Sequence, residues 1–442
     1  MTPPPEQESL KREIGVRSLS LAIVNITVGT GIFVLPALVA ENLGSTAILA
    51  YLVCGVLMFL IALCFAEVGS KVTVSGGTYA YIEKAFGPFA GFIANNIFWF
   101  GSCVISDAAV ANALADTLKY FLPVLGNPYT RALFFMVLFG GFALLNIRSL
   151  KHGVRFIEII AIAKLVPLIL LVAVGSIYIS GANLQWTSFP GMSDLSAASL
   201  LLFFAFMGLE TPVTNSGEIK NPGKTVPLGI FFGISLILIL YISIQLVTQG
   251  VLGDTLLAHK DSPLAAVAGI IFGPIGITLM IVATAISMLG GLGSEILSIP
   301  RVLYAGARNG IMPKMLGNVH PQFLTPHNAI LVYSGLGFLM AVSGGFKQLA
   351  ILSGASTLLI YLGVVLATLQ LRRLNTGPSE ITFRAPGGIL TPLLACGVII
   401  WLLTSLTQPQ LISFAIFILA LCLIYYIMQV MKKKSYLISD DR

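Results

Sequence analysis

The feature that most constrains this chain is a series of long apolar segments, each about the length that crosses a lipid bilayer. Hydrophobic residues make up 57% of the 442 residues, and charged residues only 10%. Soluble domains carry roughly 25% charged residues, and a spanning helix needs about 20 apolar residues. This composition excludes a soluble enzyme, a nucleic-acid-binding protein and a disordered scaffold, although the net charge is +7.

The apolar segments predict an all-α membrane protein with twelve transmembrane helices. Helices are favoured because each satisfies its own backbone hydrogen bonds in lipid. A β-barrel is not expected, because no alternating pattern recurs in blocks of about ten residues. The twelve segments lie near 17–41, 46–70, 88–118, 129–147, 155–179, 195–217, 226–250, 273–305, 328–344, 348–371, 389–406 and 410–431.

The positions of Lys and Arg predict that both termini lie in the cytoplasm and that the protein is in the cytoplasmic membrane. With that orientation Lys119, Arg131, Lys260 and Lys347 fall outside and Lys164 falls within a span, so twenty of the 25 basic residues are cytoplasmic. Cytoplasmic loops of membrane proteins carry such an excess of positive charge. With an odd number of spans, the Lys and Arg residues would no longer be concentrated on one side of the membrane.

Glycine interrupts two of the expected spans at corresponding places. The first contains Gly29–Gly31 in IVNITVGTGIFVLP, and the sixth contains Gly208 in LLFFAFMGLETP. Such glycines can simply allow close helix packing, but a matched pair of interrupted spans points to a transporter binding site.

The two interrupted spans are five spans apart, which predicts two five-helix repeats. The expected organisation is a cytoplasmic tail at 1–15, a first repeat at 16–179, a second repeat at 195–371, two further helices within 389–431 and a cytoplasmic tail at 432–442.

Several motifs resemble those of the amino acid–polyamine–organocation (APC) superfamily, in the order in which that family has them. They are VGTGIFVLPALVAENLG in the first span, AEVGSKVTVSGGTYAYIEKAFGPFAGF at 66–92, FFAFMGLETPVTNSGEIKNPGKTVP at 203–227, PRVLYAGARNGIMPK at 300–314 and FRAPGG at 383–388. The resemblance implies an inverted five-plus-five repeat, as in leucine-type transporters, with helices one and six broken. It also implies amino acid transport by alternating access.

The resemblance further implies how the two breaks hold the carboxylate of an amino acid. A half-helix that begins in mid-membrane offers free N–H groups and its positive dipole end to an anion. Thr30 takes the place of the family's serine, so its hydroxyl and the Gly31 N–H are expected to bind the carboxylate. The second break is expected at Met207–Gly208.

The ammonium group of the substrate is expected to meet the free carbonyls of the half-helices that end at the breaks. By the match to the family motifs, these are the carbonyls of Thr27, Phe204 and Met207. Phe206 or Phe204 is expected to cover the substrate, although either ring could equally pack in the core or against lipid.

Lys164 is the most unusual single residue, because it lies deep in the fifth span. About nine residues separate it from the cytoplasmic end, which is roughly 13 Å of helix. A lysine at this depth must pair, neutralise or line a cavity. Similar APC members often carry a lysine where sodium-dependent relatives bind Na⁺, which implies a tethered cation between spans five and one. If this lysine titrates, transport is expected to be coupled to protons; if its charge is permanent, sodium-independent exchange is expected.

Three acidic residues also fall within spans: Asp107, Glu210 and Glu295. Glu210 belongs to the sixth-span motif, which the family links to gating or proton response. Glu295 lies near the middle of span eight, where it could bind the side-chain cation of a substrate or pair with a protein hydroxyl or backbone group. Asp107 on span three could likewise bind the side-chain cation of a substrate or pair with a protein group.

The expected function is therefore sodium-independent secondary active transport of amino acids, proton-coupled or by exchange. The alternative is a polyamine or cationic amino acid antiporter that uses Glu295 and Asp107. A channel is disfavoured because single acids form no selectivity ring. Neither an enzyme nor an ATP-driven pump is expected, since catalytic and nucleotide-binding motifs do not occur. No cofactor, metal or nucleic acid is expected. The expected partners are an amino acid, membrane lipid and protons, and the sequence leaves the oligomeric state open.

Overall fold

A computed structural model describes most of the chain. The described residues are 14–72, 78–148, 154–186, 188–208, 219–308, 310, 312–374 and 383–440. Within these ranges the structure is helical, and the only strand-like pairing is an isolated bridge between Ile14 and Ile219. The all-helical prediction is confirmed for this part of the chain.

Helices of the first half cover the expected spans one to five. Their bounds are α1 Val16–Thr27, α2 Gly31–Leu43, α3 Ile48–Lys71, α4 Thr78–Phe86, α5 Pro88–Asn96, a π-helical segment η2 Ile97–Val104, α6 Ile105–Leu118, α7 Pro128–Ile147 and α8 Val154–Gly175.

Helices of the second half cover the expected spans six to twelve. Their bounds are α9 Met192–Phe203, the 3₁₀ turn η6 Phe204–Phe206, α11 Pro222–Leu252, the 3₁₀ segment η8 Gly253–His259, α12 Pro263–Arg308, α13 His327–Ser343, α14 Phe346–Arg373, α15 Leu390–Leu403 and α16 Gln408–Asp440. Helix α12 is kinked at Gly273, whose φ of +67° is not helical, so its straight part begins where span eight was expected.

The length and hydropathy of the helices identify the segments that can cross a membrane. In the described ranges seven helices are long and apolar enough to span a bilayer, and α1 and α2 form one more span bent by 60°. Four shorter apolar helices lie at 164–178, 192–206, 327–343 and 390–403. The chain is a multi-pass membrane protein.

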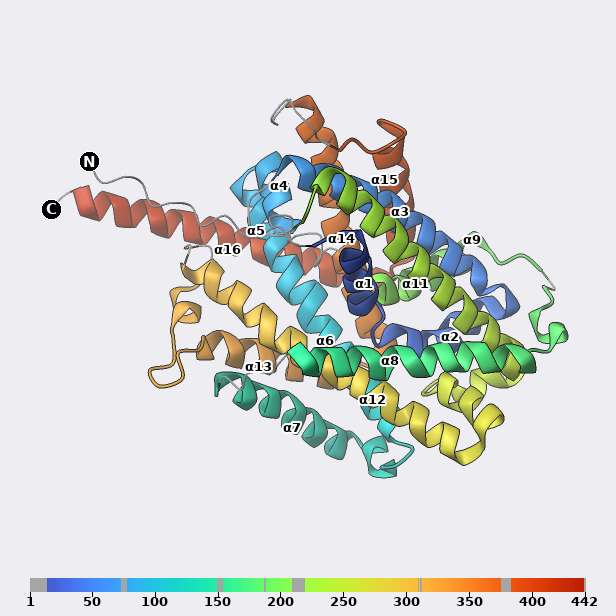
Figure 1. The fold of residues 1–442 in the computed structure, drawn as a ribbon. Helices are drawn as coiled ribbons and strands as arrows, with labels where there is room; N and C mark the ends of the chain where they lie inside the picture. The colour runs from blue at the N-terminus through green and yellow to red at the C-terminus, as the bar shows by residue number, and fades with distance from the viewer. Residues whose placement is uncertain are drawn as a thin grey trace.

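Distant parts of the chain pack side by side in the bundle (Figure 1). Helix α1 packs against α11, α2 against α9, and α6 against α14 and α12. Helix α8 lies across α12, and α7 lies beside α13. These pairings bring the first and sixth expected spans together in the interior.

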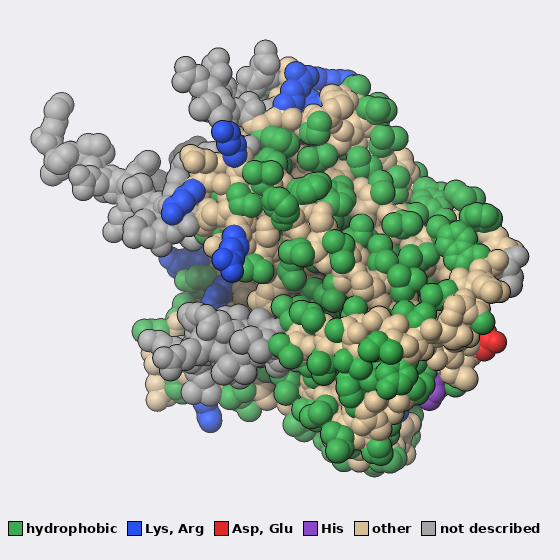
Figure 2. Space-filling view, turned by 45° about the vertical axis from the view of Figure 1, so that its right-hand side comes forward, with side chains coloured by type: hydrophobic (Ala, Val, Ile, Leu, Met, Phe, Trp, Pro, Cys, Tyr) green, Lys and Arg blue, Asp and Glu red, His purple; other side chains and the backbone are tan. Residues whose placement is uncertain are grey.

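The surface is divided into an apolar belt and charged ends. In the view of Figure 2, Lys and Arg gather at one end, while the acidic and histidine side chains lie at the other. Hydrophobic side chains cover the region between them. Helix α16 faces outward with aliphatic residues such as Ile416 and Leu419 exposed, as expected of a surface in contact with lipid.

Candidate substrate site at the helix breaks

The first expected span is interrupted at Val28–Thr30. Helix α1 ends at Thr27, α2 begins at Gly31, and the two are bent by 60°. No side chain caps the N-terminus of α2. The first N–H groups of any helix lack partners within the helix. In α2 the Phe33 N–H bonds to the Thr30 carbonyl at 3.1 Å, which leaves the N–H groups of Gly31 and Ile32 for an anion. Thr30 is buried directly beside them.

The end of α9, where the second break is expected, lies against the first break. Helix α9 passes into the 3₁₀ turn η6, after which Met207 is extended and Gly208 has a φ of +103°. A Cβ atom on Gly31 would lie 2.7 Å from the Cβ of Ala205 in η6, and one on Gly208 would lie 2.8 Å from Ile26 Cγ2. Both glycines therefore allow a close approach of the two segments.

Tyr241 connects the two segments. Its hydroxyl, which comes from α11, lies 2.9 Å from the carbonyl oxygens of both Thr27 and Ala205. Tyr241 is fully buried and packs edge-on against Phe206, with ring centroids 5.1 Å apart. One hydroxyl proton is shared between the end of α1 and the turn η6. Sequence reasoning missed this residue, although a tyrosine within an apolar span is a signal that a partner is needed.

The carbonyls at the end of α1 are largely taken by protein donors. The N–H of Val28 bonds to the Val24 carbonyl at 2.9 Å, and Lys164 Nζ donates to the Asn25 carbonyl. Among the described residues none donates to the Ile26 carbonyl, which lies beside Gly208. The carbonyl of Thr27, an expected ammonium acceptor, already accepts from the Tyr241 hydroxyl at 2.9 Å and from the Gly29 N–H at 2.8 Å, so both of its lone pairs are used.

Lys164 joins α8 to the end of α1. It is 8% exposed, and its ammonium lies at the C-terminal end of α1, where the helix dipole is negative. The deep lysine thus pairs with backbone from span one instead of reaching the surface.

The two phenylalanines of η6 are both buried. Phe204 packs edge-on against Phe346 of α14, with centroids 5.8 Å apart, and Phe206 packs on Tyr241. Neither ring faces lipid, which excludes the possibility that these residues only pack against lipid. Covering the substrate and packing in the core remain.

A cluster of hydroxyl groups lies on the side of Met207. Thr357 of α14 donates to Ser102 Oγ at 2.9 Å and lies 3.6 Å from Met207 Sδ. Ser102 belongs to the π-helical segment η2, and such bulges in helices are frequent at functional sites. Nothing in the sequence marks a π-bulge, so this part of the site could not be found beforehand.

The acidic residues of the expected site lie together. The Tyr333 hydroxyl donates to Asp107 Oδ2 at 2.9 Å, and the carboxyl group of Glu295 lies close to that of Asp107. Asp107 is 2% exposed. It therefore pairs with a protein hydroxyl, one of the two expected possibilities. Glu210 lies outside the described residues.

Comparison with known proteins identifies the family. The family model described as "Amino acid permease" matches residues 14–437. The branched-chain amino acid permease BcaP of Bacillus subtilis is 28% identical, covering 95% of this chain and 94% of that protein. The methylthioribose transporter of the same organism is 29% identical over 96% of this chain and 94% of its own length. The serine/threonine exchanger SteT of Bacillus subtilis is 27% identical, covering 88% of this chain and 90% of that protein. The resemblance drawn from the motifs is thus confirmed, and the chain belongs to the amino acid permease family of the APC superfamily.

Proposed function

We propose that this protein carries amino acids across the cytoplasmic membrane by alternating access, without sodium and with either proton coupling or exchange. The observation that carries the proposal is the contact of the interrupted first span with the end of α9 at η6 in the interior, with Lys164 at the end of α1. Free N–H groups and carbonyls at such ends suit the two charges of a zwitterion. The seven long helices, the bent pair and the four short ones follow the order of the twelve expected spans, which supports the inverted five-plus-five repeat.

Binding of the substrate follows from the same geometry. The N-terminus of α2, with the Thr30 hydroxyl and the Gly31 N–H, holds the carboxylate. The ammonium group meets the carbonyls of Phe204 and Met207 and the Ile26 carbonyl beside Gly208. Thr27 already accepts two protein donors, and Phe204 or Phe206 closes over the ammonium group. Thr30, Gly31 and both phenylalanines are buried and Gly208 is half-buried, so water competes little for the charges once the site closes.

Sodium independence is supported by the position of Lys164. Its ammonium already provides a positive charge at the carboxyl end of α1, where a bound metal ion would have to displace it. A charge-assisted hydrogen bond contributes about 1.5–3 kcal/mol, so the side chain helps to keep α8 and α1 together. Loss or gain of a proton at this lysine would change that contact, which is how a pH gradient could drive the cycle.

The substrate class rests on the family, while the relatives' names differ among branched-chain amino acids, serine or threonine, and methylthioribose. The test is uptake by proteoliposomes of a panel with leucine, serine, arginine, putrescine and methylthioribose, with and without a pH gradient and with Na⁺ or K⁺. We expect amino acids to be taken up at the same rate in Na⁺ and K⁺. Stimulation of uptake by internal substrate identifies exchange. A requirement for Na⁺, or transport of only putrescine or methylthioribose, would contradict the proposal.

A further inference from the structure

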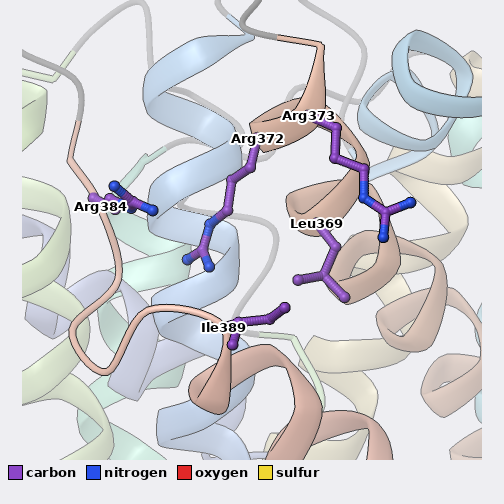
Figure 3. Close-up of a pocket in the computed structure, with 5 residues that line it drawn as sticks. All are labelled: Leu369, Arg372, Arg373, Arg384 and Ile389. Atoms are coloured by element: carbon purple, nitrogen blue, oxygen red, sulfur yellow. The ribbon is translucent and has the colours of Figure 1, made fainter.

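A small cavity lies at the basic end of the bundle, between the end of α14 and the start of α15. Its volume is about 220 Å³, and it is lined by Arg372, Arg373, Arg384, Leu369 and Ile389. Figure 3 shows Arg372 and Arg373 extending in different directions from α14, Arg384 pointing toward Arg372 from the loop before α15, Leu369 between Arg372 and Arg373, and Ile389 below Arg372. None of these residues belongs to the helix breaks, so substrate transport does not explain the cavity.

Arg372 is held rigidly at this cavity by the interior of the protein. Its Nε and Nη2 atoms lie 2.8 and 2.5 Å from the two carboxylate oxygens of Glu67, which is fully buried. Its Nη1 donates to the Gly388 carbonyl at 2.7 Å, and the same carboxylate accepts from the Ala385 N–H at 2.9 Å. The charge of Arg372 is thus balanced, while the pair fixes the loop that carries Arg384.

The other two arginines keep their positive charge available. Arg373 and Arg384 are exposed and make no ion pair with any residue in the described ranges. Gly387 and Gly388 have φ values of +80° and +58°, which turn the loop back toward α14. Two guanidinium groups therefore line the cavity from opposite sides, Arg384 beside Arg372 and Arg373 beyond Leu369 (Figure 3), and planar guanidinium groups bind phosphate oxygens well.

The apolar surroundings decide which kind of anion fits. Ile389 and Leu390 are 61% and 57% exposed beside the arginines, at the point where the apolar helix α15 begins. A free anion gains nothing from these side chains, whereas a lipid would place its acyl chains against them. Basic pockets at the cytoplasmic ends of spanning helices are known to bind lipid head groups.

We propose that this cavity binds the phosphate head group of an anionic membrane lipid. Arg373 and Arg384 contact the phosphate, Arg372 positions the loop, and Ile389 and Leu390 contact the acyl chains. A lipid held here ties the end of span ten to the start of span eleven. This proposal does not depend on which substrate the protein carries.

The test is binding of phosphatidylglycerol to the purified full-length protein in detergent, measured by native mass spectrometry and by the rise in apparent melting temperature. The wild type is expected to prefer phosphatidylglycerol to phosphatidylcholine by at least about tenfold. Each basic residue near a membrane surface contributes about 1 kcal/mol to the attraction of anionic lipid. Losing two such residues should therefore lower the affinity for phosphatidylglycerol roughly 30-fold. We expect this loss for Arg373→Gln/Arg384→Gln.

The matched control is Lys84→Gln/Lys220→Gln, which removes the same charge from two exposed residues that do not line the cavity. It should change the affinity by less than about threefold. An equal loss in both double variants would show non-specific attraction and overturn the proposal. So would a wild type with no lipid preference, or inorganic phosphate that stabilises as well as phosphatidylglycerol.

Discussion

The close approach of the two helix breaks can be tested by adding one methyl group. In Gly31→Ala the new Cβ would lie 2.7 Å from Ala205 Cβ and 2.8 Å from its Cα, and ordinary separations begin at 3.4 Å. The N-terminus of α2 and the turn η6 must separate by about 0.7 Å to accommodate it. Overpacking of this kind costs about 1–3 kcal/mol. If the substrate is held between the two segments, kcat/KM for uptake should fall about 5- to 160-fold.

Gly29→Ala is the matched control, because a Cβ at Gly29 meets only the Thr27 carbonyl oxygen at 3.8 Å. Uptake by proteoliposomes and the apparent melting temperature are measured for both variants. Adding Ala205→Gly to Gly31→Ala removes the clash with the Ala205 methyl group but leaves the clash with its backbone, so it should restore activity in part. If Gly31→Ala transports and melts like Gly29→Ala, the two breaks do not need to touch, and the reasoning fails.

Three further substitutions test the neighbouring interactions. Tyr241→Phe removes the hydroxyl shared by two buried carbonyls and should lower stability by about 1–3 kcal/mol, seen as a lower melting temperature; no change would show that water replaces the hydroxyl. Lys164→Ala should slow uptake at least about tenfold and alter its pH profile, and a wild-type rate and profile would exclude a coupling role. Glu295→Gln should affect leucine and arginine uptake equally, because Glu295 lies beside the buried Asp107; selective loss of arginine uptake would instead favour the cationic antiporter.

Much of the architecture can be read from the sequence, because lipid imposes a simple rule on every span. A segment in the bilayer must be apolar and must satisfy its own backbone hydrogen bonds. The apolar segments therefore coincide with helices, and span eight even begins at the Gly273 kink. The interruption at Gly29–Gly31 could also be predicted from the sequence, because glycine weakens a helix locally. The burial of Lys164 was also visible, from its distance along the helix.

The partners of these residues depend on tertiary structure alone. Tyr241 meets the Thr27 carbonyl across 214 positions of sequence, and Tyr333 meets Asp107 across 226. Hydropathy shows that a segment lies in the membrane, but it does not show how each helix is rotated or which neighbour it packs against. The sequence by itself thus determined the spans, the break in the first and the family. Only packing in three dimensions decided that Lys164 reaches the Asn25 carbonyl and that Asp107 and Glu295 lie beside each other, because those contacts arise from the relative positions of whole helices.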